Sequence, residues 1–286
     1  MKQIKNIIVA TDFSATSRNA YRYAKLLANS LNATLTVVYI RESMMMVADS
    51  SLVPYTIVDD AEFINQLEEL VVEENKTLQL AAIHNVKTKV GRGDVVDELV
   101  EISKEETTDL IVIGSTGLSD VLTKIFGSTS VSLSNLAHCP VLLIPRNAKW
   151  IAIERIMYAS NYASLSPIMV SNIAEFALST KADLYFVNVR NTESMIEDEP
   201  NQFDWEELFT VRNPNFYYEK ETIYGNDIVN ELIKYSTNKY IDVMCFVSNH
   251  RNFWQKLAHK SITENMAISS TIPMLVLHLD DNKYNA

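Results

Sequence analysis

The amino-acid sequence predicts an α/β fold of two tandem units, each with a five-stranded, mainly parallel sheet flanked by helices. Three observations support this prediction. The chain of 286 residues resembles itself when it is displaced by about half its length, and apolar runs alternate with amphipathic helical patterns in each half. These runs are too apolar for a sheet with one face in water, so helices are expected on both faces.

In the first half, the alternating patterns predict five strands and four helices. The strands are expected at 5–11, 34–40, 86–90, 110–114 and 140–144. The helices are expected near 16–31, 60–83, 94–106 and 127–137. Because parallel sheets of this kind bind ligands at the carboxyl ends of their strands, we expect a functional site at that edge.

The internal repeat sets the boundary between the two units. Segment 32–41 matches 180–190 at a shift of 149 positions, whereas 93–102 matches 226–235 at a shift of 133. The shift decreases from the first block to the second because the first unit has a longer middle segment, around residues 43–60. The predicted units are 1–147 and 148–286.

Composition and charge exclude several classes of protein. The net charge of −11 disfavours sequence-independent binding to nucleic acid or to an anionic membrane surface. No apolar run approaches the ~18 residues of a membrane span, and the first one is too short for a signal peptide. Cys139 and Cys245 lie in apolar surroundings in different halves, which is typical of buried, reduced thiols. We therefore expect a cytoplasmic protein with no nucleic-acid and no membrane partner.

The segment after the fourth strand carries the clearest chemical pattern. It reads GSTGLSDVLTKIFGSTS and runs directly into a predicted helix. Its glycines let the backbone approach a phosphate, and its hydroxyls and the free N–H groups of the helix start can hold an anion. It is neither a Walker loop nor the compact dinucleotide fingerprint. The residues of this pattern are Gly114, Gly117, Gly127, Ser128, Thr129 and Ser130.

The spacing of these glycines resembles the universal stress protein family, whose ATP-binding members share Gly-x2-Gly-x9-Gly-Ser/Thr after the fourth strand. The resemblance extends to Asp12 in the sequence TDFS, to Gly91 after the third strand and to CPVLLIP at the last strand. It covers nearly the whole chain and implies two tandem Rossmann-like domains of the adenine nucleotide alpha hydrolase-like type.

The resemblance also implies roles for individual residues. Asp12 and the backbone at Ile40 would contact the adenine and ribose side of ATP, with Gly91 nearby. Gly114, Gly117, Gly127, Ser128, Thr129 and Ser130 would hold the phosphates, with Mg²⁺ as a companion ion left open. One departure is Gly93, at a place where the family often has proline. Arg92 beside it is either a phosphate contact or a solvated loop arginine.

Simpler interpretations of the same residues remain open from the sequence. The glycines of segment 114–130 would also suit tight turns, and its serines would also suit a helix cap. Asp12 would also suit the N-cap of the first helix. Segment 43–60 is either a loop that closes over the nucleotide or meets a partner, or an ordinary surface loop.

The second unit is predicted to have lost the site. At the same shifts, Asn161 takes the place of Asp12, and every loop glycine is replaced while one serine is kept. The replacements are Val247 for Gly114, His250 for Gly117 and Lys260 for Gly127, and Ser261 takes the place of Ser128. We expect this unit to pack its last strand against that of the first, as an intramolecular pseudo-dimer. A further homodimer is left open.

No catalytic constellation and no metal-ligand cluster is found in the sequence. Ser128 and Ser130 lack an oriented base, because His138 has no acid placed beside it. The leading hypothesis is therefore a non-enzymatic, ATP-binding module of stress response or signalling, in which nucleotide occupancy alters the surface offered to an unknown protein partner. The alternatives are a weak ATPase or phosphotransferase, and a nucleotide-free scaffold.

Overall fold

The computed structural model describes residues 3–42, 60–79, 86–115, 127–159, 167–190, 217–248 and 271–278. The first half contains β1 (Asn6–Ala10), α1 (Ala15–Leu31), β2 (Thr34–Arg41), α2 (Asp60–Thr77), β3 (Val86–Arg92), α3 (Val95–Lys104), β4 (Leu110–Ser115), α5 (Gly127–Leu136) and β5 (Val141–Pro145). The second half contains β6 (Arg155–Ala159), α6 (Pro167–Thr180), β7 (Asp183–Arg190), β8 (Tyr218–Tyr224), α8 (Ile228–Asn238), β9 (Val243–Ser248) and β10 (Met274–His278).

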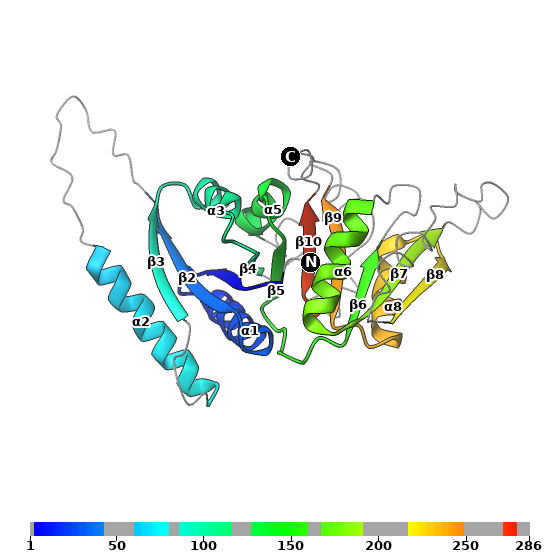
Figure 1. Ribbon diagram of the computed structural model, residues 1–286, viewed down its shortest axis with the longest axis horizontal. Helices are drawn as coiled ribbons and strands as arrows, with labels where there is room; N and C mark the ends of the chain where they lie inside the picture. Colours follow the sequence, from blue (N-terminus) through cyan, green and yellow to red (C-terminus); the bar gives the residue numbers. More distant parts are fainter. Residues whose placement is uncertain are drawn as a thin grey trace, which may run out of the picture.

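The ten strands form one sheet in the order β3-β2-β1-β4-β5-β10-β9-β6-β7-β8 (Figure 1). Each half is parallel within itself and uses the same order, whereas β5 and β10 pair antiparallel, with Leu142 opposite Leu275. The predicted α/β class with a mainly parallel sheet is confirmed, and so is the predicted packing of the two last strands.

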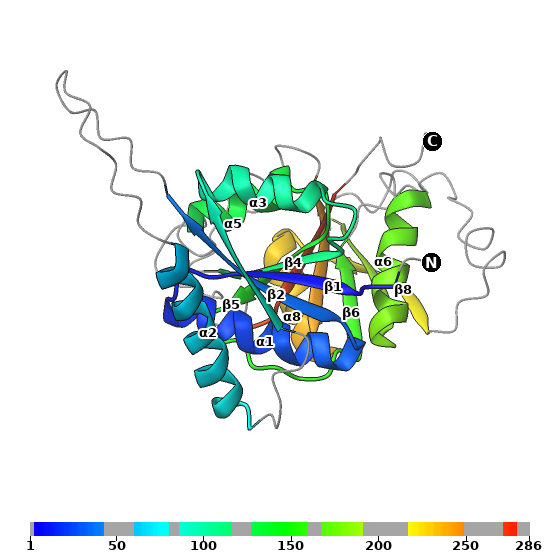
Figure 2. The ribbon, with the colours of Figure 1, turned by 60° about the vertical axis from the view of Figure 1, so that its left-hand side comes forward.

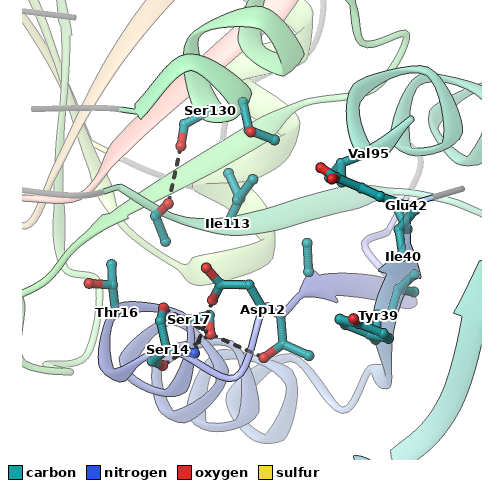
Figure 3. A pocket seen from close by; sticks show the side chains of 15 residues that line it. Asp12, Ser14, Thr16, Ser17, Tyr39, Ile40, Glu42, Val95, Ile113 and Ser130 are labelled. Atoms are coloured by element: carbon teal, nitrogen blue, oxygen red, sulfur yellow. Dashed lines mark hydrogen bonds between the residues drawn. The ribbon is translucent and has the colours of Figure 1, made fainter. Parts of the chain in front are cut away.

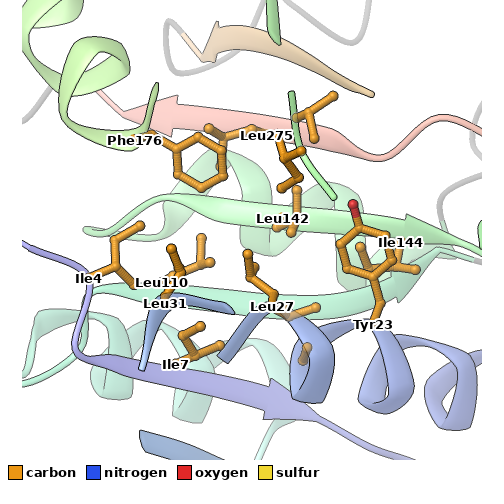
Figure 4. Close-up of a cluster of buried hydrophobic side chains, with 14 of the residues drawn as sticks. Ile4, Ile7, Tyr23, Leu27, Leu31, Leu110, Leu142, Ile144, Phe176 and Leu275 are labelled. Atoms are coloured by element: carbon orange, nitrogen blue, oxygen red, sulfur yellow. The ribbon is translucent and has the colours of Figure 1, made fainter. Parts of the chain in front are cut away.

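Helices cover both faces of this sheet (Figure 2). Helices α1, α2 and α6 pack in one apolar cluster, and α3, α5 and α8 pack in the other. Both clusters contain residues of both halves. Figure 4 shows Leu27 and Leu142 of the first half close to Phe176 and Leu275 of the second. Burial of these side chains therefore stabilises the junction as well as each half.

Local signals explain where the helices begin and end. Helix α1 begins after Ser14, whose hydroxyl accepts a hydrogen bond from the Ser17 amide, and it ends at Asn32 in the left-handed conformation (φ 54°). The second predicted helix was expected to reach residue 83. It ends at Thr77 instead, because Gln79 adopts a left-handed φ of 54° that a helix cannot continue through.

Helix α2 is attached to α1 by a buried carboxylate. The Glu74 side chain is only 3% exposed and lies between Arg18, 3.1 Å away, and Arg22 of α1. A buried carboxylate is tolerated only when it is paired and hydrogen-bonded, so this contact fixes where α2 lies. Arg18 also donates to the Phe13 carbonyl at 3.4 Å, which connects α2 to the turn after β1.

Two further observations bear on the predicted class of protein. Cys139 and Cys245 are both buried and free, as the sequence predicted. In the described part of the chain, no helix has the length and apolarity needed to cross a membrane.

Candidate functional site

A cavity of about 280 Å³ lies at the carboxyl ends of β1, β2 and β4. Strand β1 lies between β2 and β4, so the cavity opens where the order of strands along the sheet reverses. Figure 3 shows Asp12 and Ser17 on one side, Ser130 across from them, and Ile40 and Glu42 at the end of β2. The lining residues are Ala10, Thr11, Asp12, Ser14, Thr16, Ser17, Val38, Tyr39, Ile40, Glu42, Val95, Ile113, Gly114, Thr129 and Ser130.

The turn between β1 and α1 forms one wall of the cavity. Asp12 Oδ1 accepts a hydrogen bond from the Ser14 amide at 3.0 Å, and Thr11 Oγ1 accepts one from the Phe13 amide at 3.0 Å. Phe13 adopts a φ of 62°, which is unusual for a bulky residue and is often found at functional sites. The alternative that Asp12 caps the helix is wrong, because Ser14 is the N-cap.

The Asp12 carboxyl is held in its charged form. Partial burial raises its pKa, but hydrogen bonds from Ser14 and Ser17 lower it by more, so the pKa of Asp12 lies below its ordinary value. A carboxylate at this point can accept hydrogen bonds from the amine or hydroxyl groups of a ligand. The Asp12 side chain therefore offers a fixed acceptor to whatever enters the cavity.

Gly114, at the end of β4, is required by the close approach of α1. A Cβ atom at this position would lie 2.9 Å from Thr16 Cγ2 and 3.0 Å from the Thr16 carbonyl oxygen. The Ser130 hydroxyl of α5 donates to the Gly114 carbonyl at 3.1 Å. These contacts bring the first turns of α1 and α5 to the same strand end.

A sequence model of the universal stress protein family matches residues 3–145, half of the chain. The chain belongs to the universal stress protein family. A universal stress protein of Methanocaldococcus jannaschii is 30% identical over 149 residues, which are 51% of this chain and 84% of that protein. One of Bacillus subtilis is 31% identical over 150 residues, 48% of this chain and 97% of that protein.

A solved structure agrees with the fold of both halves. A universal stress protein from Archaeoglobus fulgidus aligns with a TM-score of 0.67 and 16% identity, and the alignment covers 97% of each chain. At this identity the comparison shows the fold alone. The sequence relatives cover about half of this chain, whereas this structure has the same arrangement over nearly its whole length.

Most of the predicted site residues of this universal stress protein meet at the cavity. Asp12, Ile40, Gly114, Thr129 and Ser130 all lie in its lining. The Ser130 hydroxyl already donates a hydrogen bond to the Gly114 carbonyl, so its contribution in this structure is to fix the position of α5.

The other predicted site residues lie elsewhere or are not described. Ser128 is exposed on the first turn of α5, outside the lining, and Gly127 is the first residue of that helix. Gly91 pairs with Ile40 across β2 and β3, and a Cβ there would lie 3.0 Å from Glu98 Cγ. Gly117 lies outside the described residues, as do segment 43–59 and the second-half positions Asn161, His250, Lys260 and Ser261.

The Arg92 side chain is 59% exposed, which agrees with the interpretation of a solvated arginine, although the residue ends β3 and does not lie in a loop. Its guanidinium makes two hydrogen bonds to the carboxylate of Asp60, at 2.5 and 3.3 Å, and so connects β3 to the start of α2. Arg92 is not part of the cavity lining. An ion pair between a strand end and the start of the preceding helix was not visible in the sequence, because the two residues are 32 positions apart.

The structure adds lining residues that sequence reasoning missed. Tyr39 stacks on Phe63 of α2 with ring centres 5.0 Å apart, and its other neighbour Phe13 is also at 5.0 Å. Glu42 follows directly after β2 and adds a second carboxylate to the lining. The rule that ligands gather at strand ends would have found both, because they lie at or just after the end of a predicted strand.

Proposed function

We propose that this universal stress protein is a nucleotide-binding, stress-response module in which the first unit, residues 1–147, holds ATP. The second unit, residues 148–286, serves as a structural partner without a nucleotide of its own. Occupancy of the site, and not turnover, is the functional output, because it changes the surface offered to a protein partner. The cavity at the ends of β1, β2 and β4 is the observation that carries this proposal.

The chemistry of the lining suits the two ends of a nucleotide. The Asp12 carboxylate and the backbone at Ile40 offer hydrogen-bonding groups for a base and a ribose. Thr129 and the start of α5 offer a hydroxyl and free N–H groups, the usual partners of a phosphate at a helix N-terminus. A volume of about 280 Å³ is close to the lower end of the ~300–1,000 Å³ range typical of small-molecule sites.

The lining also bears on the companion ion. Mg²⁺ usually binds through one or two carboxylates together with substrate phosphates, and Glu42 is a lining carboxylate that the contacts proposed for the base and the ribose leave unassigned. In the described part of the chain, no cluster of three or more His, Cys, Asp or Glu residues could hold a metal by itself. We therefore propose that Mg²⁺ enters with ATP. Titration of ATP with and without a chelator measures this contribution directly.

Titration calorimetry on the full chain tests the proposal. Wild-type protein is expected to bind one ATP per chain, and mass spectrometry of gently purified protein is expected to find carried-over nucleotide. Asp12→Asn removes the charged acceptor and is expected to weaken binding roughly 10- to 100-fold, the usual loss for a hydrogen bond to a charged group. Glu68→Gln, an exposed charge on α2 outside the lining, is the matched control and is expected to change nothing.

The same samples separate the alternatives. Steady-state phosphate release in step with nucleotide binding would make the protein an ATPase or phosphotransferase. Two ATP molecules per chain would contradict the loss of the second site. A chain that binds no adenine nucleotide at millimolar concentration would be the nucleotide-free scaffold.

A further inference from the structure

Helix α5 carries the phosphate end of the proposed site but has little apolar packing of its own. Its sequence is GSTSVSLSNL, in which Leu133 is fully buried whereas Leu136 is 51% exposed. Near its start it is tied to β4 by the hydrogen bond from Ser130 to Gly114. Because Leu133 is the one fully buried apolar side chain that the structure describes in α5, hydrogen bonds at the two ends of the helix add to the packing that fixes its position.

The carboxyl end of α5 is closed by two groups from outside the helix. The Ala137 amide still donates to the Leu133 carbonyl, but the next amide, of His138, donates to the Ser103 hydroxyl at 2.9 Å. That amide would otherwise have donated to the Ser134 carbonyl, four residues earlier. The Ser134 carbonyl is therefore one of the helix-end acceptors that need a partner from elsewhere.

His278, the last residue of β10, supplies that partner. Its Nε2 atom lies 2.9 Å from the Ser134 carbonyl oxygen, across 144 positions of sequence, and both residues are buried. Because a carbonyl oxygen can only accept, Nε2 carries the proton and donates. Figure 1 shows α5 beside the junction of β5 and β10, where this contact joins the second half to the first.

The contact runs in one direction only. At the shift of 133 that relates the two halves, Pro145 takes the place of His278, and each residue ends the last strand of its half. A proline side chain has no hydrogen-bond donor, so the first half cannot return the bond. The half that has lost the loop glycines thus supports the helix of the half that has kept them.

We propose that His278 is a positioning residue for the nucleotide site of the first unit. By holding the Ser134 carbonyl, it fixes α5, whose first turn lies seven residues or ~10 Å of rigid helix away, at the phosphate end of the cavity. The inference rests on the proposed function and gives the second half a role in it. The ligand class is unchanged: an adenine nucleotide with its phosphates at the start of α5.

Three full-chain variants test the proposal. His278→Leu removes the donor and is expected to weaken ATP binding roughly two- to tenfold, the range for loss of one net hydrogen bond. His278→Gln keeps an N–H donor at similar reach and is expected to recover part of the loss. Leu275→Ala, on the same strand but packed in the cluster with α1 and α6, is the matched control, expected to lower the melting temperature and leave ATP affinity unchanged.

Hydrogen exchange of the amides in 127–136, measured without nucleotide, gives a second readout. Exchange is expected to rise in His278→Leu and not in Leu275→Ala. Unchanged affinity together with unchanged exchange in His278→Leu would overturn the proposal, as would an equal loss of affinity in Leu275→Ala. If the wild-type chain binds no ATP, the proposed function fails, and the exchange measurement alone decides whether His278 positions α5.

Discussion

The two halves of this universal stress protein share their scaffold and differ at their strand ends. Asp109 accepts hydrogen bonds from two successive backbone amides at the start of β1, both at 2.9 Å. Asp242, its counterpart at the shift of 133, accepts from two successive amides at the start of β6, at 2.8 and 2.9 Å. Asp94 and Asp227 likewise both cap the helices that follow, α3 and α8. The two halves thus use the same contacts to build their parts of the sheet.

The difference lies at the end of the fourth strand of each unit. Gly114 ends β4 beside the cavity, and Val247 stands at the same place in β9. The sheet accepts either residue, since both strands are paired on both sides. Contacts that build the sheet and contacts that shape the cavity are therefore carried by separate residues, so a unit can lose the second set and keep its fold.

The largest effect is expected when Gly114 is replaced by valine, the residue at the equivalent strand end of the second half. Gly114→Val would place a Cβ within 3.0 Å of Thr16 atoms, so α1 or β4 must shift. We expect this overpacking to cost about 1–3 kcal/mol of stability and to weaken ATP binding at least tenfold. Urea denaturation and calorimetry measure the two quantities.

The matched change in the second half is Val247→Ala. It shortens a partly buried side chain at the equivalent strand end and is expected to lower stability while leaving ATP affinity as in the wild type. If Gly114→Val bound ATP as tightly as the wild type, the proposed difference between the two strand ends would be wrong, because the glycine would then have no special place in the site.

The paired aspartates test the shared scaffold and give the next largest effect. Asp109→Ala and Asp242→Ala each leave two backbone amides without their acceptor, which costs about 1–3 kcal/mol for partly buried groups. We expect similar losses in urea denaturation for the two variants and no change in ATP affinity for Asp242→Ala. A loss confined to one variant would show that the two halves do not depend on the same contact.

The sequence predicted the sheet better than it predicted the site. Continuous apolar runs such as IIVA and DLIVI leave few alternatives to a buried strand, so the strand positions were confirmed to within about two residues. That Ser14 and not Asp12 caps α1 depends on backbone angles that sequence alone does not fix. Tyr39 stacks on Phe63 of α2, and His278 reaches α5 across 144 positions. Such contacts follow from tertiary packing, which no local pattern encodes.

The smallest expected effect compares how two carboxyls respond to pH. The pKa of Asp12 is lowered in the folded state, so its contribution to stability is present above its ordinary pKa and is lost as pH falls through the folded value. Burial raises the pKa of Asp242 and outweighs its two amide hydrogen bonds, so protonation on lowering the pH favours the folded state at this position.

The two asparagine variants should therefore show opposite trends. Between neutral pH and about pH 3.5, the stability advantage of wild type over Asp12→Asn is expected to shrink, whereas that over Asp242→Asn is expected to grow. Urea denaturation at several pH values measures both slopes. Slopes of the same sign would contradict the comparison, because the charged carboxyl of Asp12 beside the cavity and the partly buried carboxyl of Asp242 at the start of β6 must respond to protons in opposite directions.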